Sequence, residues 1–176
     1  VGHRDASDAP PDRRSELSAW LRAHARVLAA ALLMGAGSAA VWSFGRSILV
    51  DAGAGDALSL VSWIGIGVGG ALAVATAGAL ERIGARRAWA LTATTIALTT
   101  GALALAAGSA PLAIGACAAF GWAYMAGTGA LISWTRAIDP GRAASGTAML
   151  FVVLVLGQAV GAAAVGAAAP FVGLAG

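Results

Sequence analysis

The chain has 176 residues, of which 59% are hydrophobic and only 11% are charged. Soluble domains carry roughly 25% charged residues, so this composition excludes an ordinary soluble globular protein and indicates one built for lipid. The formal net charge of +3 does not indicate nucleic-acid binding, because the basic residues lie in short segments between apolar runs and not in one patch with aromatic residues.

Five apolar runs follow one another, and each is long enough to cross the roughly 30 Å hydrocarbon core of a bilayer. Gly and Ala are frequent within them, as in membrane helices, and the alternating pattern of a membrane β-barrel is missing from the sequence. The sequence therefore predicts an all-α integral membrane protein, a polytopic bundle of five transmembrane helices. We expect a polar, flexible linker over residues 1–25 and a transmembrane domain over 26–176, with spans at 27–50, 58–80, 88–107, 111–135 and 143–169.

The charges predict how the chain is oriented. Arginines gather before the first span, between the second and third, and between the fourth and fifth, and these three segments fall on one side of a five-span path. The connections on the other side hold Asp51 and Asp56 and no cation. The positive-inside rule then places the N-terminus in the cytoplasm of a multi-pass plasma-membrane protein. Every cation is Arg, which together with the abundant Ala and Gly favours a bacterial inner membrane. The arginines of the three segments are Arg4, Arg13, Arg14, Arg22, Arg26, Arg82, Arg86, Arg87, Arg136 and Arg142.

The first span contains the remaining cation, Arg46, one helical turn after Trp42. A cation at the centre of a membrane helix costs roughly 2.5–3.5 kcal/mol, so it needs water or a partner. Two interpretations stay open. Arg46 either reaches the outer headgroups or Asp51, or it faces a central cavity and binds an anionic group there.

The connection between the second and third spans reads Glu81-Arg82-Ile83-Gly84-Ala85-Arg86-Arg87. We expect Glu81 and Arg82 to end one helix, Gly84 to supply the backbone freedom of a short turn, and Arg86 and Arg87 to open the next helix. Such arginines bond the exposed carbonyl groups of a neighbouring helix end in one conformation and release them in another. The loop is therefore either a gating element or a plain cytoplasmic turn.

Polar residues inside the other spans are few. Gly65 and Gly69 have the spacing that lets two membrane helices approach closely. Tyr124 and Thr128 lie four residues apart on one face of the fourth span. Gln158 is an uncharged polar group in the middle of the fifth span, where it should face protein or water and not lipid. Tyr124 and Thr128 are each either a substrate contact or a helix-packing residue. Gln158 is either a cavity residue or the donor of an interhelical hydrogen bond.

Residues 77–87 resemble the conserved cytoplasmic loop of the major facilitator superfamily, whose pattern is Gly-x-x-x-Asp/Glu-Arg-x-Gly-x-Arg-Arg/Lys. Residues 139–146 are similar to that family's link between its tenth and eleventh spans, and residues 157–161 to the glycine-rich centre of the eleventh. Ala77 stands where the pattern has its first Gly, and Ala162 where the eleventh span usually has Pro. The residues that match the loop pattern are Glu81, Arg82, Gly84, Arg86 and Arg87.

The resemblance implies spans seven to eleven of a twelve-span transporter, so that the chain would be the C-terminal half of that transporter, a partial six-helix half without its last helix. Its partners would be the bilayer, the missing N-terminal six-helix half and a small-molecule substrate, moved by alternating access. A proton-coupling carboxylate, if there is one, is expected in the missing half, because no acid lies deep in these spans. The cavity candidates are Arg46, Trp42, Tyr124, Thr128 and Gln158.

The sequence also bears on two other classes of function. A non-transporting membrane scaffold or accessory protein would have the same topology without a water-filled cavity. An enzyme is not expected, because His3 and His24 are the only histidines and both precede the first predicted span. Neither a catalytic Ser–His pair nor a metal-binding cluster can be assembled within the spans, so we expect no cofactor and no metal.

Overall fold

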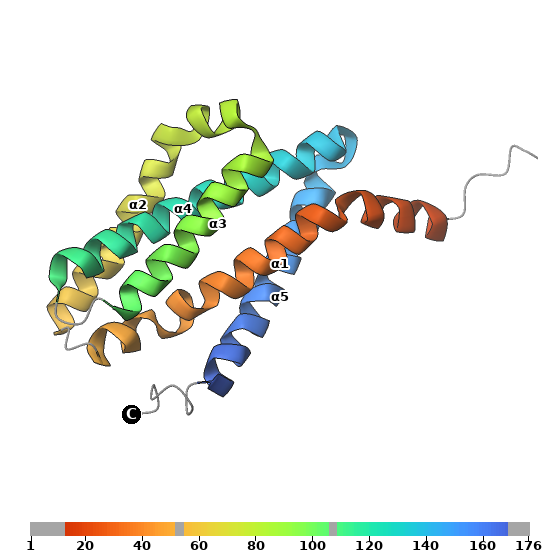
Figure 1. The fold of residues 1–176 in the computed structure, drawn as a ribbon. Coiled ribbons are helices and arrows are strands. Elements are labelled where there is room, and N and C mark those ends of the chain that lie inside the picture. Colours follow the sequence, from red (N-terminus) through yellow and green to blue (C-terminus); the bar gives the residue numbers. More distant parts are fainter. Residues whose placement is uncertain (1–12, 52–54, 106–108, 169–176) are drawn as a thin grey trace, which may run out of the picture.

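The computed structural model describes residues 13–51, 55–105 and 109–168, which fold almost entirely into helices (Figure 1). The helices are α1 (Arg13–Asp51), α2 (Asp56–Ile83), α3 (Ala85–Ala104), α4 (Ala110–Ile138) and α5 (Ala143–Ala168), with the 3₁₀ turn η1 (Pro140–Arg142) before α5. These residues contain no strand, which confirms the all-α prediction. Arg4 and His3 lie outside the described residues.

Four of these helices are long and apolar enough to cross a membrane: α1 over residues 13–47, α2, α4, and α5 taken together with η1. A helical bundle of membrane-spanning character is therefore confirmed. The helix outside this set is α3, the third predicted span. It has 20 residues, which include two arginines and five threonines, and these lower its mean hydropathy.

The helix ends agree with the predicted spans to within a few residues, except at the start of α1. This helix has 39 residues and is about 58 Å long at 1.5 Å per residue, far more than the hydrocarbon core needs. Residues 13–25, predicted as part of a flexible linker, are helical. They follow Pro11, contain no Gly or Pro, and include three Arg, three Ala and two Leu, all good helix formers. The residue at which the apolar run begins is therefore not the residue at which the helix begins.

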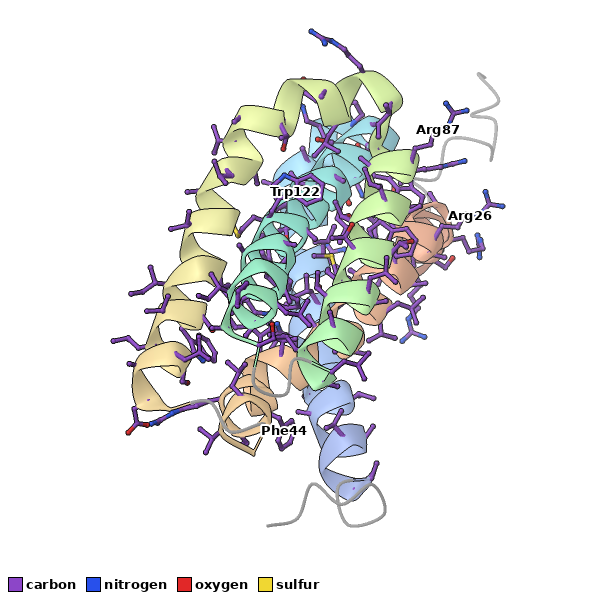
Figure 2. The ribbon with its side chains drawn as sticks, turned by 60° about the vertical axis from the view of Figure 1, so that its left-hand side comes forward. Arg26, Phe44, Arg87 and Trp122 are labelled. Atoms are coloured by element: carbon purple, nitrogen blue, oxygen red, sulfur yellow. The ribbon has the colours of Figure 1, made fainter. Side chains whose placement is uncertain are left out.

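The bundle consists of two groups of helices (Figure 1). α4 packs mainly against α2 and α3, α1 packs mainly against α5, and contacts of α1 with α3 and α4 join the groups. The α2–α3 turn and the α4–α5 connection lie at the same end as the start of α1. We call this the basic end, after Arg22, Arg26, Arg82, Arg86, Arg87, Arg136 and Arg142. Figure 2 shows Arg26 and Arg87 at this end and Phe44 at the opposite end.

Glycines set the closest helix contacts. A Cβ atom added at Gly69 would meet the backbone of Ala118 in α4, and one added at Gly121 would meet the backbone of Ile66 in α2. One added at Gly65 would lie 3.4 Å from the carbonyl oxygen of Ile114. The packing role predicted for Gly65 and Gly69 is therefore confirmed. Between helices in lipid such close approach supplies much of the association energy.

A single residue, Gly84, separates α2 from α3. Its backbone has φ 84° and ψ 149°, the positive-φ region that side chains rarely adopt. Its amide nitrogen donates to the carbonyl oxygen of Glu81 at 3.1 Å, and its carbonyl oxygen accepts from the amide of Ala88 at 3.0 Å. The prediction that this turn requires Gly84 is confirmed.

Replacing Gly84 by Ala is expected to lower the free energy of unfolding by about 1–3 kcal/mol, because the methyl group strains a backbone conformation that only glycine adopts freely. The measurement is an SDS unfolding titration followed by circular dichroism. Gly78→Ala is the matched control, because its added Cβ atom meets nothing within 4 Å. Equal stability of the two variants would contradict the prediction.

Candidate functional site

Four aromatic side chains from three helices meet in the half of the bundle away from the basic end. The ring of Trp42 in α1 lies 6.1 Å from that of Trp63 in α2, 5.7 Å from Phe120 and 5.3 Å from Tyr124, both in α4. The rings of Phe120 and Tyr124 stack with their centroids 6.1 Å apart. Trp42 is about one-third exposed, so this aromatic cluster presents part of its surface at the edge of the described bundle.

A polar pair adjoins the cluster. The side-chain amide of Gln158 in α5 donates to the hydroxyl oxygen of Tyr124 at 3.0 Å. Trp42, Tyr124 and Gln158, predicted separately from three spans, are thus brought together. α1, α2, α4 and α5 all contribute to this site. It offers aromatic faces for stacking and two polar groups for hydrogen bonds.

Two predicted candidates lie outside this network. The hydroxyl of Thr128 donates to the carbonyl oxygen of Tyr124 at 2.8 Å, a bond within α4 itself. Arg46 lies one turn beyond Trp42, and its side chain is 70% exposed. It pairs with Asp56 at the start of α2, with 3.4 Å between Nη2 and Oδ1. An ion pair so exposed contributes little to stability.

Some members of the network were missed from the sequence. Trp63 and Phe120 complete the aromatic cluster. Outside this network, the indole nitrogen of Trp122, which Figure 2 labels, donates to the hydroxyl oxygen of Thr76 in α2 at 2.8 Å. Phe120 precedes Tyr124 by four residues, so it shares a helix face with it. That spacing was the available signal. For Trp63 the sequence offered no such signal, because its contact with Trp42 depends on how α2 is aligned with α1.

At the basic end the residues of the α2–α3 turn lie as predicted. Glu81 and Arg82 are in the last turn of α2, and Arg86 and Arg87 are in the first turn of α3. The guanidinium carbon of Arg86 lies 5.3 Å from the ring centre of Trp134 in α4, a cation–π contact. It connects the turn to the end of α4.

A buried polar junction near the basic end was also missed. His24 in α1 is 1% exposed and stacks on Trp20 with 3.9 Å between ring centres. Its Nδ1 bonds the carbonyl oxygen of Trp20 at 2.9 Å. A Cβ atom added at Gly146 of α5 would meet the methyl group of Thr135 in α4 and lie 3.9 Å from His24 Nε2. Neither His24 Nε2 nor the hydroxyl of Thr135 has a hydrogen-bond partner among the described residues. The junction holds the ends of three helices together.

Within residues 13–51, 55–105 and 109–168, no group of three or more His, Cys, Asp or Glu side chains could hold a metal ion. Comparisons with models of protein families, with curated proteins and with solved structures found no match. The function is therefore argued from the geometry of the site.

Proposed function

We propose that this chain is one half of a secondary transporter that moves a small solute across a membrane by alternating access. The observation that carries the proposal is the Gln158–Tyr124 hydrogen bond beside the aromatic cluster, where four helices meet. Polar side chains within membrane helices are expensive, and they mark solute pathways in transporters. A site built where several helices converge suits a solute that must be released to either side.

The proposal counts α3 as a membrane span in addition to the four helices that are long and apolar enough to cross a membrane. Four of the five threonine hydroxyls of α3 donate to carbonyl groups within the helix, which lowers the cost of placing them in lipid. Thr92 donates to the carbonyl oxygen of Ala88 at 3.0 Å, Thr99 to that of Thr95 at 2.8 Å and Thr100 to that of Ile96 at 2.8 Å. With five spans, the basic end faces the cytoplasm of a bacterial cell and so does the N-terminus.

The second half of the transporter would come from a further six-helix unit, as the resemblance to the major facilitator superfamily implies. The α2–α3 turn supports a gating role, because the contact of Arg86 with Trp134 is one that helix movement would break. Arg46 remains a candidate for an anionic solute only if it leaves Asp56.

A scaffold or accessory membrane protein is the second candidate. One observation favours it: Tyr124 and Gln158 satisfy each other, as buried polar groups do in a purely structural interface. The two functions differ in one physical respect. A transporter must admit water to Trp42 and Tyr124 in at least one of its states, whereas a scaffold keeps them dry.

Cysteine accessibility tests this difference without knowledge of the solute. Trp42→Cys and Tyr124→Cys are made in a Cys117→Ala background, because Cys117 is the chain's one cysteine. In native membranes, a membrane-impermeant thiosulfonate reagent is expected to modify both cysteines, since thiolates form and react only where water reaches them.

The control is Leu98→Cys on the exposed face of α3, where Leu98 is 69% exposed and would lie against lipid. It is expected to stay unmodified. Modification of Leu98→Cys at the same rate as the two site cysteines would mean that the assay reports no cavity. Absence of modification at positions 42 and 124 would leave the scaffold as the better function.

A further inference from the structure

A cavity of about 470 Å³ lies between α2 and α4 beneath the α2–α3 turn. It is distinct from the aromatic cluster, with which it shares no residue. One wall comes from α2, the other from α4, and the first turn of α3 closes one side. Its lining residues are Gly70, Ala73, Val74, Ala77, Leu80, Glu81, Ala85, Ala88, Met125, Ala126, Gly129, Ala130, Ser133 and Ala137.

The cavity exists because the two helices diverge where their side chains are small. At Gly69 and Gly121 the backbones of α2 and α4 touch. Towards the basic end the facing residues are mostly Gly and Ala, which cannot fill the widening gap. Pockets of roughly 300–1,000 Å³ are the usual size of small-molecule sites. The volume therefore points to a ligand.

The lining fixes the chemistry of that ligand. Its walls are almost wholly apolar, and Glu81 is the one charged residue among them. Glu81 forms no ion pair within the described part of the chain. Arg82, the next residue in α2, makes no ion pair within the described part of the chain. Arg86 lies over Trp134, and Arg87 projects from α3 on the side away from α2 (Figure 2). A carboxylate at the rim of an apolar cavity is complementary to a cation on an apolar body.

We propose that this cavity binds a small lipid-soluble amine, whose ammonium group pairs with the carboxylate of Glu81 and whose apolar body lies between α2 and α4. The volume suits a molecule of one or two rings and is too small for a whole diacyl phospholipid. The amine enters from the bilayer, because Val74, which lines the cavity, is 81% exposed on the surface of an apolar helix. The proposal stands independently of solute transport, and its test measures binding alone.

The test uses the purified full chain in phosphatidylcholine vesicles and the photoreactive probe 4-(aminomethyl)benzophenone. Its uncharged N-acetyl derivative is the matched neutral probe. After irradiation, mass spectrometry locates the labelled peptides. We expect labelling within residues 70–80 and 125–137, stronger for the amine than for the neutral probe by about tenfold, equivalent to ~1.4 kcal/mol.

Paired variants test separately the contribution of the Glu81 carboxylate and that of the cavity volume. Glu81→Gln should remove the preference for the amine, whereas Glu16→Gln, an exposed carboxylate of α1, should keep it. Gly129→Phe should block labelling by filling the cavity, because a Cβ atom at Gly129 meets nothing within 4 Å. Gly115→Phe in the same helix, equally open but outside the cavity, should not block it. If Gly129→Phe does not insert, Ala77→Phe fills the same space.

Three results would overturn the proposal. Equal labelling by the two probes, or an amine preference that survives Glu81→Gln, would remove the carboxylate from the site. Labelling of residues 70–80 and 125–137 that persists in the filled variants would place the probe elsewhere. Loss of labelling when phosphatidylethanolamine replaces part of the phosphatidylcholine would show that a lipid headgroup, and not a small amine, is the ligand.

Discussion

Gly69→Ala is expected to lower the free energy of unfolding by about 1–3 kcal/mol, the range for an overpacked contact. The added Cβ atom would lie 2.7 Å from the carbonyl carbon of Ala118 and 3.0 Å from its Cα atom. These are backbone atoms, so no side-chain rotation relieves the contact and α2 must move away from α4. Gly67→Ala, two residues earlier, meets nothing within 4 Å. It should raise stability by roughly 0.5–1 kcal/mol through helix propensity.

The expected loss is large because lipid changes what holds helices together. Lipid tails are as apolar as the helix surfaces, so association depends on van der Waals contact and interhelical hydrogen bonds. Van der Waals attraction falls steeply within an ångström of added separation. A shift at Gly69 therefore also loosens the contact of Trp63 with Trp42 and the bond from Trp122 to Thr76.

The measurement is an SDS titration of both variants in mixed micelles, followed by circular dichroism. The opposite signs of the two effects are the test, because any general consequence of adding a methyl group to α2 would act on both variants alike. Equal stability of Gly69→Ala and Gly67→Ala would mean that α2 and α4 do not touch at Gly69.

The helices themselves were predictable from the sequence because their signals are local. Apolar runs placed the spans to within a few residues, and Gly84 within a charged segment located the turn. The early start of α1 was missed, because hydropathy indicates which residues lie in lipid and not which residues form the hydrogen bonds of a helix. The interpretation of residues 77–87 as a major-facilitator loop stays a prediction.

The contacts between helices were less predictable. Almost every face of these helices is apolar, so the pattern does not show which face packs and which meets lipid. Trp42, Tyr124 and Gln158 were chosen as unusual residues in apolar runs, but their meeting depends on interhelical alignment. Arg46 was expected to reach Asp51 if it paired at all. Its partner in the structure is Asp56, in the first turn of the next helix.

The cavity beneath the α2–α3 turn had no sequence signal of its own. It is formed by missing side-chain volume along two helices, and Gly and Ala occur throughout this chain. Gly and Ala let α2 and α4 touch at Gly69, whereas nearer the α2–α3 turn they leave the cavity between the same two helices. The difference lies in the path of α2, which approaches α4 closely at Gly69 and departs from it towards Glu81.

Substitutions at the contact between α1 and α5 are expected to have the second large effect on the free energy of unfolding. The effects of two such substitutions should not be additive. A Cβ atom at Gly157 would lie 3.0 Å from the carbonyl carbon of Leu32, and one at Gly161 would lie 2.7 Å from the Cα atom of Ala36. Each single change to Ala should cost about 1–3 kcal/mol. The first change already moves α5 away from α1, so the double variant should cost less than the sum, by about 0.5 kcal/mol or more.

An SDS titration of the four proteins closes this double-mutant cycle, and Gly166→Ala in α5 is the control. Its Cβ atom would make only an ordinary contact, 3.9 Å from the ring of Phe44. It should therefore gain about 0.5–1 kcal/mol from helix propensity. Strict additivity of the two costs would mean that the contacts at Gly157 and Gly161 yield independently and that α5 does not move as a unit.

The same variants connect packing to the candidate site, because Gln158 lies between the two glycines. If α5 moves as a unit, the 3.0 Å bond from Gln158 to Tyr124 lengthens with it. Tyr124 is the chain's one tyrosine, so a ¹³C label on the phenol carbon gives a single resonance. We expect Gly161→Ala to shift that resonance as Gln158→Leu does, and Gly166→Ala to leave it in place. An unmoved resonance in Gly161→Ala would separate the site from the helix packing that surrounds it.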